Sequence, residues 1–317
     1  MIALLLSVVP GAAALCTAVG DGRYALTDYH VVRTGHEADA LAVGDLDGDG
    51  LDDVVAGTGW SYEGFYVQPF LQTGGGLVGG AEVAVPAGGS TTSEFGSVAL
   101  GDVDADGDLD AVAGTLGGAY LLPNDGTGGL GAAVSLGGSR YFAVLLLDAD
   151  ADGHLDLLGL THYAVHVAWG DGTGDYAAPT ELFETEGTPV ALAIAHAGGG
   201  ERPDLLISQE GATGFAVWTD TGPRAYTFEG AWDLDERRNG GALAVGDLDA
   251  DGLTDAVLAG GGNRPTNLSL FFQDAGGFGA LATIGSYDIP GSVVVADVDT
   301  DGLDDVVVTH GGWGCVG

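Results

Sequence analysis

The segment Asp45-Leu46-Asp47-Gly48-Asp49-Gly50-Leu51-Asp52-Asp53 is the most informative part of this chain, because its pattern returns along the whole length. The pattern is Asp-x-Asp-x-Asp-Gly-x-x-Asp, and complete copies lie at 45–53, 102–110, 148–156, 247–255 and 297–305. An eroded sixth copy spans 196–204, with His196 in place of the first aspartate. Successive copies are roughly 50 residues apart, so one structural unit is repeated around each of them.

The spacing of the carboxylates predicts a loop around a hard cation. The side chains at positions one, three, five and nine converge only if the chain curls tightly, and the glycine at position six permits that curl. Ca²⁺ takes six to eight oxygen ligands and suits such a loop, so we expect five Ca²⁺ sites. The expected side-chain ligands are Asp45, Asp47, Asp49, Asp53, Asp102, Asp104, Asp106, Asp110, Asp148, Asp150, Asp152, Asp156, Asp247, Asp249, Asp251, Asp255, Asp297, Asp299, Asp301 and Asp305.

Position seven is expected to offer its backbone carbonyl, since its side chain varies between copies. The residues there are Leu51, Asp108, His154, Leu253 and Leu303. We therefore expect the imidazole of His154 to be a bystander. The eroded copy keeps only Asp204 among its carboxylates and adds Arg202, so we expect no metal in that fourth loop.

Two alternative structures fit the pattern less well. A helix–loop–helix calcium site needs a glutamate at position twelve and flanking helices. The twelfth residues here are Ala56, Ala113, Gly159, Leu258 and Val308. An ordinary Asp-Gly turn needs one carboxylate, not four in fixed register.

The sequence around each loop predicts strands. In the fifth unit, four strands are expected at 242–245, 255–259, 268–272 and 279–284, with the acidic loop between the first two. Short apolar runs bounded by glycine and aspartate are typical of buried strands. Repeats of this length with several strands predict the blades of an all-β propeller.

These units resemble FG-GAP or VCBS-type repeats, the calcium-loop blades of integrin α-subunit propellers. The resemblance rests on 44–55 and its four close copies, and Phe95-Gly96 matches the "FG" element. It covers nearly the whole chain. It implies a β-propeller with Ca²⁺ in the loop between strands A and B of each blade, and it implies little about activity, since such propellers serve adhesion, glycan binding and scaffolding.

The two ends of the chain are expected to complete one blade. The last acidic loop is followed by one strand, 306–309, and the missing third and fourth strands are expected at 14–19 and 24–33. This closure gives six blades, with seven as the alternative, in a single domain over 15–317. It also brings Cys16 and Cys315 into one blade, where we expect a disulfide; two free thiols are the alternative.

Residues 1–14 are apolar and end in small residues, which is typical of a signal peptide cleaved after Ala14. The segment is too short to span a membrane. We therefore expect a secreted or cell-surface protein, in keeping with the millimolar Ca²⁺ outside cells.

The charge restricts the possible partners. The net charge is −38, and all eight basic residues are arginine. Such a surface repels nucleic acid and anionic membranes, so we expect neither as a partner. The absence of lysine excludes Schiff-base chemistry and a phosphate-loop lysine.

Sequence signals for catalysis are poor, and we expect no enzyme. Gly126–Gly131 matches Gly-x-Gly-x-x-Gly but lies between short strands, so it is interpreted as a hairpin turn. No Gly-x-Ser-x-Gly element is present, and the scattered histidines show no His-x-x-x-His zinc spacing on a helix.

The functional surface is expected on the blade ends opposite the acidic loops. The B–C and D–A loops there carry residue types that are enriched at binding hot spots. They are Trp60, Tyr62, Trp232, Arg237, Arg238, Arg264 and Trp313. We favour a monomeric module that binds a protein or cell-surface partner, with a lectin-like glycan-binding propeller as the alternative and a polysaccharide-acting enzyme third.

Overall fold

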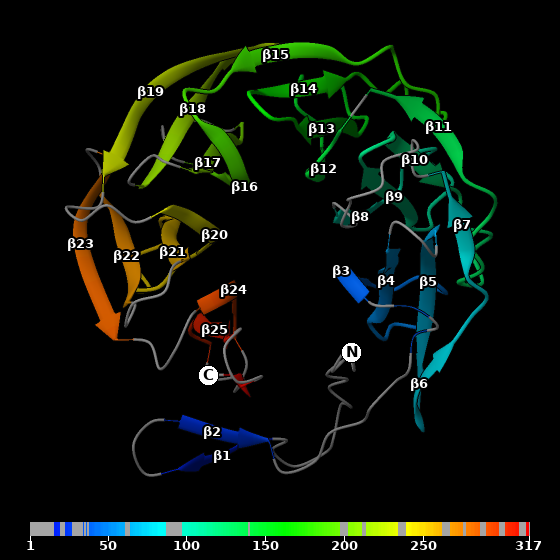
Figure 1. The fold of residues 1–317 in the computed structure, drawn as a ribbon, viewed down its shortest axis with the longest axis horizontal. Coiled ribbons are helices and arrows are strands. Elements are labelled where there is room, and N and C mark those ends of the chain that lie inside the picture. The colour runs from blue at the N-terminus through cyan, green and yellow to red at the C-terminus, as the bar shows by residue number, and fades with distance from the viewer. Residues whose placement is uncertain are drawn as a thin grey trace. The chain divides into compact units, whose positions relative to one another are not determined.

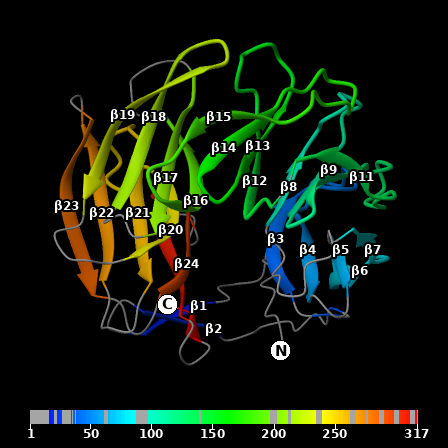
Figure 2. The ribbon, with the colours of Figure 1, turned by 45° about the horizontal axis from the view of Figure 1, so that its top comes forward.

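Every regular element described by the computed structural model is a β-strand (Figures 1 and 2). The description covers residues 16–19, 23–26, 34, 36, 38–60, 64–86, 97–138, 140–196, 202–210, 214–233, 239–261, 267–274, 277–285, 290–297, 302–310 and 315–316. The chain divides into two compact units, Met1–Glu181 and Leu182–Gly317. Among the described residues, no helix is long and apolar enough to cross a membrane.

The first part of the chain forms one hairpin and three antiparallel sheets. The hairpin pairs β1 (Cys16–Val19) with β2 (Arg23–Leu26). The first sheet has β3 (Ala38–Gly44), β4 (Asp53–Trp60), β5 (Gly64–Thr73), β6 (Gly76–Gly79) and β7 (Val83–Val85). The second has β8 (Ser97–Gly101), β9 (Asp110–Thr115), β10 (Gly118–Leu122) and β11 (Val134–Gly137). The third has β12 (Ala143–Leu147), β13 (Asp156–Leu160), β14 (Ala164–Ala168) and β15 (Thr180–Glu184).

The remaining residues form three further antiparallel sheets. The fourth has β16 (Thr188–Ala195), β17 (Asp204–Glu210), β18 (Gly214–Gly222) and β19 (Ala225–Asp233). The fifth has β20 (Asn239–Gly246), β21 (Asp255–Gly261), β22 (Asn267–Asp274) and β23 (Gly277–Gly285). The sixth has β24 (Pro290–Ala296), β25 (Asp305–His310) and β26 (Cys315–Val316).

The predicted order of four strands per unit is confirmed. In the fifth sheet, the observed strands contain all four predicted ranges and extend each by one to three residues at most ends. The Gly126–Gly131 stretch forms the expected hairpin turn, closed by an isolated bridge between Asn124 and Leu130. Each acidic loop joins the first strand of a sheet to the second, as the sequence predicted.

Neighbouring sheets pack face to face through apolar side chains. Between the first and second sheets, the core includes Val55, Val67, Val98 and Ala113, which are all buried. The fourth and fifth sheets share a similar core. The second strand of a sheet is covered on both faces, since every residue of β9 and β13 is buried. The short apolar runs in the sequence are therefore explained by two-sided burial.

Closure of the last blade by the chain ends stays a prediction. In the described residues, β1 pairs with β2, and β25 pairs with β24 and, at Thr309 and His310, with β26. Cys16 and Cys315 begin β1 and β26, but their side chains lie outside the description, as do residues 1–15 and the predicted fourth strand beyond Leu26. The number of blades and the disulfide also remain predictions.

Candidate metal centres

The acidic loops share one backbone shape, in which the first aspartate caps the turn. In the first loop, Oδ1 of Asp45 accepts from the N–H of Asp49 at 3.1 Å, and Oδ2 accepts from Gly50 at 2.9 Å. The same glycine bond recurs at 3.2, 2.9, 2.9 and 2.9 Å in the other four complete copies. The glycine at position six has φ between 85° and 100° in all five, which a side chain would resist.

Position four shows backbone strain in three loops. Ala105, Ala151 and Ala250 have φ of 60°, 61° and 61°, a region that residues with a Cβ seldom occupy. The first loop has Gly48 at the same place. Strain of this kind persists where the surroundings determine the backbone, and it gathers at ligand-holding sites.

Four of the loops bring carboxylates together closely enough to hold a metal ion. Within each cluster, ligand oxygens lie within 4.8 Å of one another. The clusters are Asp45 with Asp47 and Asp53, Asp102 with Asp104 and Asp106, Asp148 with Asp150 and Asp156, and Asp247 with Asp249 and Asp251. Three converging carboxylates repel one another, and a hard divalent cation with a preference for oxygen ligands would offset that repulsion.

The last complete copy lies partly outside the described residues. Asp299 and Asp301 belong to that undescribed part, so this site stays a prediction. Asp297 nevertheless accepts from Gly302 as its counterparts do, at 2.9 Å.

The aspartate at position nine has a second role that sequence reasoning missed. Asp53 is fully buried, and its two oxygens accept from the backbone N–H groups of Leu46 at 2.9 Å and Gln72 at 2.6 Å. Asp110, Asp156 and Asp255 are buried and bonded in the same way. The carboxylate therefore links the start of the loop to the end of the third strand, and those of Asp53 and Asp156 also belong to the acidic clusters.

Burial of these carboxylates changes their acidity. Removal from water raises the pKa of Asp110 and of Asp156 to about 6, against the lowering effect of the backbone N–H groups. Burial also raises the pKa of Asp53 and Asp255. In the absence of a cation, position nine thus holds a proton more readily than an ordinary aspartate.

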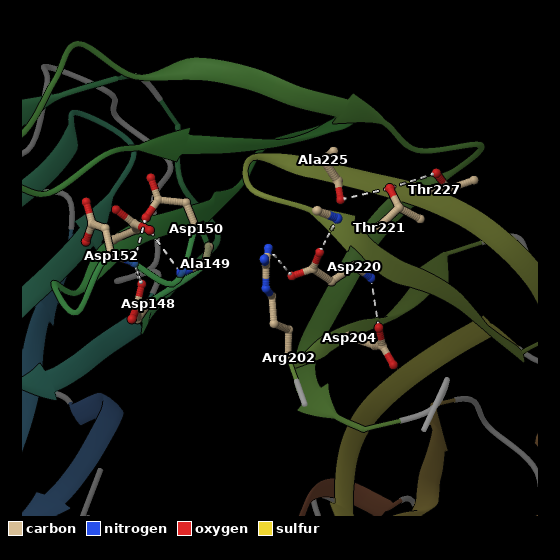
Figure 3. Close-up of polar contacts among 12 residues, drawn as sticks. Asp148, Ala149, Asp150, Asp152, Arg202, Asp204, Asp220, Thr221, Ala225 and Thr227 are labelled. Carbon is tan, nitrogen blue, oxygen red and sulfur yellow. Dashed lines mark hydrogen bonds and ion pairs between the residues drawn. The ribbon is translucent and has the colours of Figure 1, made fainter. Parts of the chain in front are cut away.

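The eroded fourth loop keeps the hydrogen bond between the ninth aspartate and the third strand, but its sequence lacks the aspartates at positions one, three and five. Asp204 is buried, and its Oδ1 accepts from the N–H of Asp220 at 2.8 Å (Figure 3). Arg202, at position seven, places Nη1 3.6 Å from Oδ2 of Asp220. A guanidinium thus stands beside the carboxylate of Asp220, whereas none of the five complete loops has an arginine at position seven. Residues 197–201 lie outside the description, so an empty fourth loop remains a prediction.

The side chain at position seven packs on the hairpin between the third and fourth strands of its own sheet. A Cβ at Gly172 would lie 2.2 Å from Nδ1 of His154, so the imidazole covers that turn. Asp108 lies against Gly126 in the same way. Sequence variation at this position therefore follows the neighbouring hairpin.

The predicted partner face is described at only part of its residues. Trp232 packs its ring against Phe215, at a centroid distance of 5.8 Å, and its Nε1 donates to the carbonyl of Phe278. This tryptophan therefore joins β19 to β23 in addition to bordering a surface pocket. Trp60 ends β4 with its side chain outside the description. Tyr62, Arg237, Arg238, Arg264 and Trp313 lie outside the described residues.

Similarity to known structures identifies the fold. A lectin from Agrocybe aegerita that recognises non-reducing terminal N-acetylglucosamine has a TM-score of 0.61 and 19% identity, covering 87% of this chain and 79% of its own. A periplasmic gluconolactonase of Pseudomonas aeruginosa has a TM-score of 0.59 and 16% identity, covering 94% and 87%. The Dos1 propeller has a TM-score of 0.52 and 11% identity, covering 87% and 67%. At these identities the likeness shows the fold alone, a β-propeller.

Similarity in sequence comes from family models. The FG-GAP repeat matches 38–76, and the FG-GAP-like repeat matches 102–159 and 247–308. Among curated protein sequences, none is a significant relative of this chain. The three matched segments contain acidic loops, and together they cover half of the sequence. The chain therefore belongs to the FG-GAP repeat β-propellers.

Proposed function

We propose that this protein is a secreted, calcium-stabilised β-propeller that binds a protein or cell-surface partner. The observation that carries the proposal is the recurrence of the carboxylate cluster on an identical backbone in four loops. Asp residues at positions one, three, five and nine would hold Ca²⁺, with the carbonyl of position seven as a further ligand. Bound Ca²⁺ would supply positive charge between carboxylates, and no reaction step is assigned to it.

The location of the proposed ion favours a structural role. The clusters lie between the first two strands of each sheet, and position nine links them to the third strand. An ion at this place holds three strand ends together. Extracellular calcium modules have dissociation constants of about 10⁻⁴–10⁻³ M, which fits an exported protein that meets Ca²⁺ outside the cell.

A binding role is favoured over catalysis because the sequence signals for catalysis are poor. Glycan binding is the alternative, in view of the lectin with this fold. Hydrolysis of a sugar lactone or polysaccharide is the third possibility, in view of the gluconolactonase. At these identities both neighbours count only as examples of what the fold can support.

The test of calcium dependence has two readouts. Metal analysis of the dialysed protein is expected to give five Ca²⁺ per chain, with none for the fourth loop. If each site has a Kd of about 0.1–1 mM, then about 1 mM Ca²⁺ adds roughly 0.4–1.4 kcal/mol per site, so removal of Ca²⁺ from all sites by EDTA lowers Tm. An unchanged melting curve in EDTA would contradict the proposal, and six ions would contradict the interpretation of the fourth loop.

The test of partner class uses the calcium-loaded protein as a probe. Labelled protein is applied to intact cell surfaces before and after protease treatment, and to a glycan array, each with Ca²⁺ or EDTA. Protease-sensitive, Ca²⁺-dependent binding supports a protein partner. Array binding without protease sensitivity supports the lectin alternative instead.

A further inference from the structure

The outer strands of the fourth sheet form a small hollow that is separate from the acidic loops. β18 and β19 pair Ala216 with Ala231 and, beyond a bulge, Trp218 with Phe228. Side chains of directly paired residues lie on one face of a sheet, and alternate residues share that face. The small side chains of Ala216 and Ala231 therefore leave a shallow depression beside the larger rings of Trp218 and Phe228.

This hollow is a surface pocket of about 380 Å³, including the part open to solvent. Its polar lining consists of Glu186, in the turn between β15 and β16, and Gln209, near the end of β17. All other lining residues are apolar or glycine.

The two rings form a corner rather than a flat surface. Phe183 stacks on Trp218 with centroids 3.8 Å apart and an interplanar angle of 10°, which fixes the indole from one side. Phe228 meets Trp218 at 5.5 Å and 62°. Phe228 is 42% exposed, so its ring is accessible from solvent.

The charge of this corner favours a cation. Glu186 is exposed, and no ion pair joins it to a basic residue in the described part of the chain. The whole protein carries −38, so its field concentrates cations at the surface. Aromatic faces attract cations within about 6 Å, and quaternary ammonium groups are the ligands that aromatic corners with a nearby carboxylate recognise.

We propose that the Trp218–Phe228 corner binds an alkylated ammonium group, such as the trimethylammonium of a choline compound. The methyl groups would lie on Ala216, Ala231 and the two rings, and the charge would face Glu186. The proposal rests on the proposed function, because it names a ligand class for the binding module. A neutral sugar fits less well, since one carboxylate and one amide cannot serve the several hydroxyls of a pyranose.

The direct test compares choline with 3,3-dimethyl-1-butanol, its neutral isostere, by calorimetry or saturation-transfer NMR on the calcium-loaded protein. Choline is expected to bind and the isostere to bind several-fold more weakly. Equal affinity for the two compounds, or no choline binding at millimolar concentration, would overturn the proposal. N-acetylglucosamine serves as a neutral sugar probe, and its occupying the pocket in place of choline would also overturn it.

Substitutions then place the ligand. Phe228→Leu keeps apolar volume but removes the ring, and Glu186→Gln keeps the shape but removes the charge. Each is expected to weaken choline binding about 2- to 5-fold, the ratio that corresponds to one exposed cation–π or ion contact. Tyr163→Leu is the matched control, because Tyr163 is a 63% exposed aromatic in the turn between β13 and β14. Equal weakening by Tyr163→Leu would contradict a specific site.

Two further arms distinguish the sources of the ligand and the two proposals. Binding to phosphatidylcholine vesicles, with phosphatidylglycerol vesicles as the control, shows whether the protein binds the trimethylammonium group on a lipid headgroup or only in a free compound. Phe228→Leu must reduce either kind of binding. The EDTA-induced fall in Tm is measured on the same samples. If that fall is present and choline does not bind, the ligand inference alone fails; if the fall is absent, the proposed function fails.

Discussion

At the scale of single residues, the aspartate at position nine explains why the eroded repeat keeps one carboxylate and loses three. Asp204 still accepts a hydrogen bond from the backbone N–H of Asp220, as Asp53, Asp110, Asp156 and Asp255 accept theirs. The sequence pattern predicted that the loop carboxylates converge, and in four loops three of them lie close together. It did not indicate the fastening, because the donors are backbone N–H groups of residues as different as Gln72 and Gly170, which leave no side-chain signature.

The two roles of these aspartates are separable by substitution. Asp255→Ala would leave the buried N–H groups of Leu248 and Gln273 without an acceptor, at about 1–3 kcal/mol each. We expect this loss of unfolding free energy even in EDTA, measured by denaturant melts. Asp251→Ala, at exposed position five of the same loop, is the control: its effect in EDTA should be within about 0.5 kcal/mol, while its calcium response falls. Similar losses for both variants in EDTA would disprove the separate fastening role.

The raised pKa of the ninth aspartates predicts an acid limit for calcium binding. In the metal-free protein, Asp110 and Asp156 have a pKa of about 6, above the ordinary 3.8, so the folded state binds more protons in between. Their contribution to stability is present below about pH 4 and is lost as pH rises through about 6. Ca²⁺ requires the ionised form, so its stabilisation must fade as pH drops below about 6. We expect the Tm curves in Ca²⁺ and EDTA to converge between about pH 7.5 and 5; a constant gap would contradict this.

At the scale of strands and sheets, the period of the repeat predicted the four-strand units, but not where the fourth strand breaks. In the first sheet that strand is divided into β6 and β7. The break lies opposite Pro69 of β5, which has no N–H to donate, so only its carbonyl is used, by Gly80 at 2.8 Å. In the third sheet, Ala177 donates to the carbonyl of Trp169 at 2.8 Å in the same way, so this arrangement does not require proline, and strand propensity alone does not reveal it.

Contacts between neighbouring sheets explain the glycine before several acidic loops. A Cβ at Gly44 would lie 2.7 Å from Cδ1 of Leu109 in the next sheet, and one at Gly101 would lie 2.7 Å from Cδ1 of Leu155. The following sheet thus packs directly on the backbone at the ends of β3 and β8. The amide of Asn124 adds a hydrogen bond of 2.7 Å to the carbonyl of Leu46 across the same boundary.

This packing gives a prediction at the level of the sheet. Gly101→Ala should destabilise the protein by about 1–3 kcal/mol, because the methyl group overpacks the boundary. Gly74→Ala is the matched control, since no atom lies within 4 Å of its added Cβ, and it should be nearly neutral. In a Leu155→Ala background, Gly101→Ala should cost less unfolding free energy than it does in the unchanged protein, because the shorter side chain leaves room for the added methyl group. Additive losses in the double variant would show that the two residues do not meet as described.

At the scale of the whole molecule, the sequence predicted the propeller class more firmly than its closure. The fold class follows from a local pattern that each unit repeats, and each unit packs against its neighbours through local apolar strands. The blade count depends instead on how two distant chain ends pair, and no repeated signal encodes that contact. The proposed ligand site is harder still to predict from the sequence. The corner at Trp218 and Phe228 arises from the register and a bulge between β18 and β19, not from a sequence motif.

Because of the high net charge, the stability of the protein depends on the ions in solution. The chain carries −38, and its acidic clusters hold oxygens within 4.8 Å, well inside the Debye length of about 8 Å at 0.15 M salt. Added NaCl therefore screens repulsion between distant loops but little of the repulsion inside a cluster. We expect Tm in EDTA to rise as NaCl goes from about 0.05 to 0.5 M, without reaching the Tm in about 1 mM Ca²⁺. MgCl₂ at equal ionic strength should also fall short, because Mg²⁺ demands a smaller octahedral site. If NaCl alone restored the full calcium Tm, the loops would be acting as a diffuse negative surface, and specific ion coordination would be disproved.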